Sequence, residues 1–170
     1  MSDATLRNLT AASLVIGALL GIGGTFTPSA DLRSLEWGID GVALVLGSAL
    51  LAVHHIRRGN EQLAAGFLVF LAGQVLIAYG SGMDVEATGP SLAAGGGLWA
   101  AGLALVSASP VMPAFVRLTG AIAAVLLAIT AGKTLLGADL TDLSQPLPFF
   151  AYPFLAATLI GWAWVHRRPT

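Results

Sequence analysis

The sequence predicts an all-α integral membrane protein, built as a bundle of six transmembrane helices. The first observation is composition: of 170 residues, 56% are hydrophobic and 10% are charged, with a mean hydropathy of +0.82. A soluble domain carries roughly a quarter charged residues, so this chain has too few to cover a soluble surface. The second observation is that charges are absent from six stretches. Each stretch is close to the length of about 20 residues that a helix needs to cross a bilayer.

These stretches use most of the chain, so we expect one transmembrane domain over residues 1–170 with no separate soluble domain. The predicted spans are approximately 8–27, 39–56, 62–80, 91–109, 114–136 and 147–166. Between the first two spans, Leu32, Leu35 and Trp37 follow near-helical spacing after Pro28. This spacing predicts a short amphipathic segment, approximately residues 28–37, on the outer surface.

The distribution of basic residues predicts the orientation. With six spans, both termini share one side with six of the eight Lys and Arg residues: Arg7, Arg57, Arg58, Arg117, Arg167 and Arg168. Short loops rich in Lys and Arg stay in the cytoplasm, so both termini are expected there. Because no targeting signal is evident, we expect a bacterial cytoplasmic (inner) membrane.

A short pattern suggests an internal repeat. Ala-Asp-Leu-x-x-Leu occurs at 30–35 and again at 138–143, and each copy precedes a helix that ends in His followed by two Arg. This recurrence is compatible with a parallel duplication of helix hairpins 1–2 and 5–6. Chance identity is the alternative, because the chain is rich in Ala and Leu.

Glycines recur at regular spacing in several spans. Gly66, Gly73 and Gly80 are seven residues apart, and Gly17 and Gly21 are four apart. Small residues let membrane helices approach closely, so we expect glycine-rich helix packing. For the three consecutive glycines at 95–97, the alternative to helix packing is that they form a wall against which a flat ligand lies.

Four residues within the spans are candidates for a ligand site or pathway: Lys133, Asp40 and Tyr79 near the outer ends, and Gln74 in the middle of the third span. Ionisable groups within a span are costly and often functional. An ion pair between Lys133 and Asp40 would line a polar outer pocket. Alternatively, Lys133 extends its ammonium group to the lipid headgroups. Gln74 has a similar alternative, an interhelical hydrogen bond.

The inner ends of the second and sixth spans hold a second set of candidates: His54, His55, His166, Arg57, Arg58, Arg167 and Arg168. We expect these histidines to bind headgroups, the arginines to set topology or contact anionic lipid, and Trp162 and Trp164 to lie at the interface. Haem ligation by His55 and His166 is disfavoured by the adjacent arginines. No cofactor and no metal site are predicted.

Several functional classes are excluded by the composition. The absence of cysteine excludes disulfides, thiolate metal sites and a Cys nucleophile. Eight basic residues against nine acidic ones leave no basic face for nucleic acid. No catalytic residue is predicted, because the histidines and most of the acids fall on opposite sides.

Three hypotheses for function follow. The first is a non-enzymatic packing or binding protein in the lipid bilayer, which associates with its own copies, a partner membrane subunit or a lipophilic ligand. The alternative is a small-solute transporter or channel with its polar pocket around Lys133 and Asp40. The third is a membrane enzyme that acts on lipid, supported only by the inner histidines and arginines.

Overall fold

The structure, a computed structural model, describes residues 3–80, 85–137 and 146–167, and these residues form six α-helices. They are α1 (Asp3–Phe26), α2 (Ala30–Arg57), α3 (Glu61–Gly80), α4 (Val85–Ala108), α5 (Ala114–Leu135) and α6 (Pro146–Arg167). The all-α prediction is therefore confirmed. Within the described residues, α1 to α5 each contain a stretch long and apolar enough to cross a membrane, which indicates a membrane protein.

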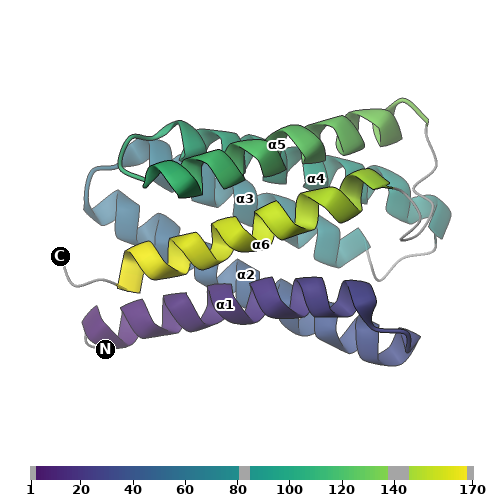
Figure 1. Cartoon of the computed structure of the whole chain (residues 1–170), viewed down its shortest axis with the longest axis horizontal. Coiled ribbons are helices and arrows are strands. Elements are labelled where there is room, and N and C mark those ends of the chain that lie inside the picture. Colours follow the sequence, from purple (N-terminus) through teal and green to yellow (C-terminus); the bar gives the residue numbers. More distant parts are fainter. Residues whose placement is uncertain (1–2, 81–84, 138–145, 168–170) are drawn as a thin grey trace.

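The helices form a closed ring in chain order. Each helix packs against its neighbours in sequence, and α6 closes the ring by packing between α5 and α1 (Figure 1). The start of α1 and the end of α6 lie at the same end of the bundle (Figure 1). We call this the arginine-rich end, because it carries Arg7, Arg57, Arg58, Arg117 and Arg167. Asp31, Glu36 and Lys133 lie toward the opposite end.

The largest difference from the predicted elements is in α2. This helix starts at Ala30 rather than near residue 39, so residues expected to form a separate amphipathic segment are its first turns. The Ser29 hydroxyl caps the helix by accepting a hydrogen bond from the Leu32 amide at 3.4 Å. Nothing after this cap stops the helix, since Gly38 costs only about 1 kcal/mol relative to Ala. At 28 residues, α2 is about 42 Å long and exceeds a hydrocarbon core of about 30 Å.

The second copy of the proposed repeat, at 138–143, lies outside the described residues. The duplication of hairpins 1–2 and 5–6 therefore stays a prediction.

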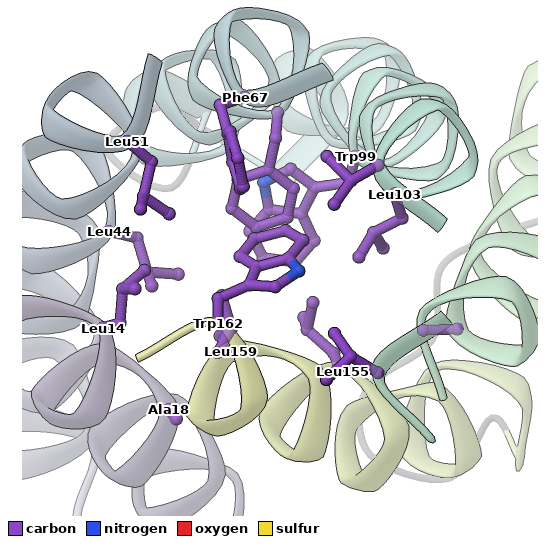
Figure 2. Packing of buried hydrophobic residues seen from close by; sticks show 14 of the residues in the cluster. Leu14, Ala18, Leu44, Leu51, Phe67, Trp99, Leu103, Leu155, Leu159 and Trp162 are labelled. Carbon is purple, nitrogen blue, oxygen red and sulfur yellow. The ribbon is translucent and has the colours of Figure 1, made fainter. Parts of the chain in front are cut away.

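Four aromatic side chains fill the middle of the ring, where Figure 2 shows Phe67, Trp99 and Trp162 close together. The ring centres of Phe67 and Trp162 are 4.8 Å apart, and Phe70 stacks on Trp99 at 5.3 Å. We call Phe67, Phe70, Trp99 and Trp162 the aromatic plug. The expectation that Trp162 lies at the interface is wrong, because Trp162 is fully buried. Trp164 is exposed, because residues two positions apart in an α-helix point to nearly opposite faces.

Glycines bring the backbones of α3 and α4 into contact. A Cβ atom at Gly73 would lie 2.6 Å from the carbonyl oxygen of Gly95, and one at Gly102 would lie 2.7 Å from that of Gly66. Real Cβ atoms essentially never approach so closely, so larger residues would push these helices apart. Gly66 and Gly73 of α3 thus pack against α4 within this chain.

Candidate functional site

Asp40 is the centre of the first candidate site. Its side chain, on the inward face of α2, is only 8% exposed. It borders a cavity of about 20 Å³, enough for one water molecule. The cavity is otherwise lined by Gly17, Ala18, Gly21, Ile22, Leu44, Trp99, Tyr152, Leu155, Ala156 and Leu159, from α1, α2, α4 and α6. We call Asp40 and these lining residues the Asp40 pocket.

Two glycines of α1 make room for the carboxylate. A Cβ atom at Gly17 would lie 3.2 Å from Asp40 Oδ1 and would collide with Leu44. A Cβ atom at Gly21 would lie 3.4 Å from Asp40 Oδ2. The four-residue spacing of these glycines therefore lets α1 pass directly over the acidic group.

Polar atoms in and beside the Asp40 pocket lack partners among the described residues. Asp40 Oδ1 and Trp99 Nε1 are buried without a hydrogen bond. Gln74 Oε1 is also unpartnered, and the other end of the Gln74 amide lies against the α2 backbone at Gly41. Buried polar atoms are nearly always hydrogen-bonded, so each exception requires an explanation. A donor or a cation in the cavity would satisfy the carboxylate.

The structure brings together only two of the four residues that were candidates for the ligand site or pathway. Asp40 and Gln74 are buried on α2 and α3, which pack against each other. Tyr79 is 64% exposed. Lys133 is exposed on α5, and in the described part of the chain α5 packs on α4 and α6 but not on α2. An ion pair between Lys133 and Asp40 is therefore not formed.

The second candidate site joins α2 to α6 at the arginine-rich end. The Nε2 atoms of His55 and His166 are 2.8 Å apart. The ring of His54 lies edge-on to both, at centroid distances of 5.1 and 5.4 Å. Each of the three residues directs a ring nitrogen inward, and these nitrogens lie within 4.8 Å of one another. We call His54, His55 and His166 the histidine cluster.

The hydrogen bonds of the cluster determine its tautomers. His166 Nδ1 lies 2.7 Å from the Trp162 carbonyl oxygen, which only accepts, so this nitrogen carries the proton. In a neutral ring, His166 Nε2 is then an acceptor. His55 Nε2 donates to it, and His55 Nδ1 accepts from the Asn60 amide at 3.4 Å. Every ring nitrogen of His55 and His166 therefore has a partner.

His55 and His166 were expected to bind lipid headgroups, but their rings are buried in the bundle. His55 is 3% exposed and His166 is 7% exposed, so that expectation is wrong for both. His55 stacks on Phe67 of the aromatic plug, at a centroid distance of 5.5 Å. The charges of Arg7 and Arg58 act on His54, the half-buried member.

The remaining inner candidates lie around the histidine cluster or beyond it. Arg57 and Arg167 are exposed at the arginine-rich end, and Arg168 lies outside the described residues.

Haem ligation by His55 and His166 would need the two axial nitrogens about 4 Å apart, given metal–nitrogen bonds of about 2 Å. The observed distance of 2.8 Å does not suit that arrangement.

One sequence signal connects both sites. Asp40, Leu44, Ser48, Leu51 and His55 are spaced by four, four, three and four residues, which places them along one face of a helix. All five are buried. A stripe that carries an acid, a hydroxyl and an imidazole between leucines predicts that the polar residues share the interior.

Comparison with known proteins does not identify the chain: no protein-family model matches it, and neither a curated protein nor a solved structure is significantly similar. Function must therefore be argued from the two sites themselves.

Proposed function

We propose that this chain is a six-span integral membrane protein of the bacterial cytoplasmic membrane, with α6 as its sixth span and both termini in the cytoplasm. The support is the charge distribution. Both ends of the chain approach the arginine-rich end, and basic residues accumulate on the cytoplasmic side of membrane proteins. The Asp40 pocket would then lie toward the outer side.

Within that arrangement, we infer that the protein is a non-enzymatic transport protein for a small cation. The species would be a hydrated proton or a small monovalent metal ion, and it would bind at Asp40. One observation carries this inference: within the described residues, Asp40 Oδ1 is buried without a hydrogen-bond partner, at a cavity the size of one water molecule. An ionisable group inside a membrane protein is costly, so an unpaired one implies a functional role.

The surroundings of Asp40 suit a small cation rather than a larger solute. Apart from Asp40, Trp99 and Tyr152, the lining is aliphatic or glycine, and the volume of about 20 Å³ excludes an organic molecule. The aromatic plug lies between the Asp40 pocket and the histidine cluster, because its Trp99 lines the pocket and its Phe67 stacks on His55. Translocation would therefore require the plug to move, as expected for alternating access.

This proposal reverses the order of the hypotheses drawn from sequence. Association with a partner was motivated by the regular glycines, but Gly66 and Gly73 of α3 are in contact with α4 of the same chain. Gly17 and Gly21 of α1 adjoin Asp40. The glycines are therefore accounted for without a partner, whereas the unpartnered carboxylate is not.

The test is cation flux into proteoliposomes. Purified protein is reconstituted into vesicles that contain a pH-sensitive dye, and proton entry is driven by a potassium diffusion potential. A parallel arm measures uptake of radioactive sodium. We expect flux above that of protein-free vesicles in one arm, and its loss in Asp40→Asn, which keeps the shape but removes the charge.

Asp31→Asn is the matched control, because Asp31 is an exposed acid on the same helix. Its flux should equal that of the wild type. Equal flux in Asp40→Asn and wild type, or no flux in either arm for correctly folded wild-type protein, would overturn the proposal.

A further inference from the structure

We propose that the histidine cluster is a binding site for a divalent first-row transition-metal ion such as Zn²⁺, Co²⁺ or Ni²⁺. The inference is independent of the transport function, because the cluster and the Asp40 pocket lie on opposite sides of the aromatic plug. Neutral imidazole is the commonest metal ligand in proteins and suits these ions.

The first argument is convergence. Two helices that do not pack directly on each other, but both pack on α1, deliver three imidazole nitrogens to one place. His54 and His55 come from the last turns of α2, and His166 comes from the last turn of α6. The protein contains three histidines, and all three are in this cluster. A role limited to packing would not require every histidine of the chain to gather at one point.

The second argument is the hydrogen bonds made by the ring nitrogens that point away from the centre of the cluster. Metal-bound histidines usually donate their second N–H group to a carbonyl, carboxylate or water, which holds the ring in place. His166 does so through Nδ1 to the Trp162 carbonyl, and its Nε2 points into the cluster. His55 also directs Nε2 inward, while its Nδ1 lies next to the Asn60 side chain. Both buried rings are thus oriented as ligands.

Binding would require small adjustments, among them an approach of the His54 nitrogen, because the three nitrogens are up to 4.8 Å apart. Two nitrogens on one tetrahedral zinc ion are about 3.3 Å apart, for bonds of about 2.0–2.1 Å. The His55 and His166 nitrogens, at 2.8 Å, must therefore separate slightly. His55 must also move its proton from Nε2 to Nδ1, and a rotated Asn60 amide would accept it through its oxygen. Since His55 and Asn60 are near the end of α2 and the turn after it, these shifts need no change in the helix frame.

Three protein ligands leave at least one coordination position open. The positive charges of Arg7 and Arg58 both act on His54, so the surroundings of the histidine cluster are cationic. These charges oppose a bare divalent ion and favour an anionic ligand, such as hydroxide or chloride, at the open position. The site would therefore hold the metal together with a non-protein ligand.

The experiment measures metal binding by full-length protein purified without a polyhistidine tag and treated with a chelator. Co²⁺ is titrated first, because its visible absorption reports the coordination geometry, and Zn²⁺ is then used as a competitor. We expect one equivalent of Co²⁺ per chain and its displacement by one equivalent of Zn²⁺. Zn²⁺ should also raise the melting temperature of the wild type, whereas Mg²⁺ should not, because only ligands that bind the folded state stabilise it.

Variants of the three histidines test which side chains bind the metal. His55→Ala and His166→Ala should each weaken Co²⁺ binding by more than about 100-fold, and His54→Ala should remove the tetrahedral absorption. Arg167→Ala is the matched control, because Arg167 is exposed next to His166, and it should bind like the wild type. Absence of binding and of a Zn²⁺-dependent melting shift in the wild type would overturn the proposal. So would undiminished binding in the His55→Ala/His166→Ala double variant.

Discussion

At the arginine-rich end, His55 and His166 hydrogen-bond to each other, and their remaining ring nitrogens meet Asn60 and the Trp162 carbonyl. Toward the opposite end, Asp40 Oδ1 and Trp99 Nε1 are equally buried, but neither has a partner among the described residues. The aromatic plug lies between these regions.

The difference separates two kinds of buried polar group. A fully partnered network stabilises the fold by itself, and removal of one member leaves the others unsatisfied. An unpartnered group costs free energy in the resting protein and is explained by a ligand that arrives later. The histidine cluster should therefore matter for stability, while Asp40 should matter for function at the expense of stability.

The largest effect is expected for His166→Leu in the presence of a chelator. The substitution leaves His55 Nε2 without its partner and removes the side-chain hydrogen bond to the Trp162 carbonyl, so the free energy of unfolding should fall by about 1–3 kcal/mol. Reversible unfolding in mixed detergent micelles measures this change. A loss no larger than that of exposed Arg167→Leu would show that the hydrogen bonds contribute little.

A double-mutant cycle sharpens this result. His55→Leu should also be destabilising, but the double variant His55→Leu/His166→Leu should lose clearly less than the sum of the single variants. The reason is that removal of both partners leaves no orphaned Nε2 atom at the contact. We expect a coupling energy of about 1 kcal/mol, measured by the same unfolding assay. Strict additivity would mean that the 2.8 Å contact carries no net energy.

Asp40→Leu should change the free energy of unfolding in the opposite direction to His166→Leu. The substitution removes a buried carboxylate whose Oδ1 lacks a hydrogen-bond partner among the described residues, so the free energy of unfolding should rise by about 1 kcal/mol while cation flux is lost. Unfolding and flux are measured on the same preparation. If Asp40→Leu destabilised the protein as strongly as His166→Leu, the two regions would not differ in the proposed way.

The smallest effect is expected for Lys133→Ala. Lys133 is exposed on α5, which does not pack on α2 in the described part of the chain. Stability should change by less than about 0.5 kcal/mol, and proteoliposome flux should equal that of the wild type. A large loss of flux would restore Lys133 to the pathway and would contradict the position of the site deduced from Asp40.

The candidate sites were only partly predictable. Asp40 and Gln74 were identified because a polar group inside a span is conspicuous in an apolar sequence. Lys133 and Tyr79 met the same criterion, yet both face outward. Depth along a helix can be counted from the sequence, but the side of the helix that meets the bundle depends on packing against its neighbours. The expected pairing of Lys133 with Asp40 failed for that reason.

The amphipathic segment shows a related difference. Leu32, Leu35 and Trp37 do follow helical spacing, and the structure does form a helix there. The sequence could not distinguish a separate surface helix from an extension of α2, because Gly38 permits both. Contacts decided the outcome: Trp37 packs against Gly24 of α1, and Glu36 accepts a hydrogen bond from Thr27 at 2.6 Å.

The sequence by itself determined the helical class, the approximate position of each helix, and the collection of basic residues at one end. Those properties depend on hydrophobicity and charge along the chain, which are local. Tertiary structure alone decided that His55 faces His166 and that Trp162 belongs to the core. It also decided that Asp40 Oδ1 is left without a hydrogen-bond partner in the described part of the chain. Each of these facts depends on how helices distant in sequence are rotated against one another, and that rotation is set by packing across the whole ring.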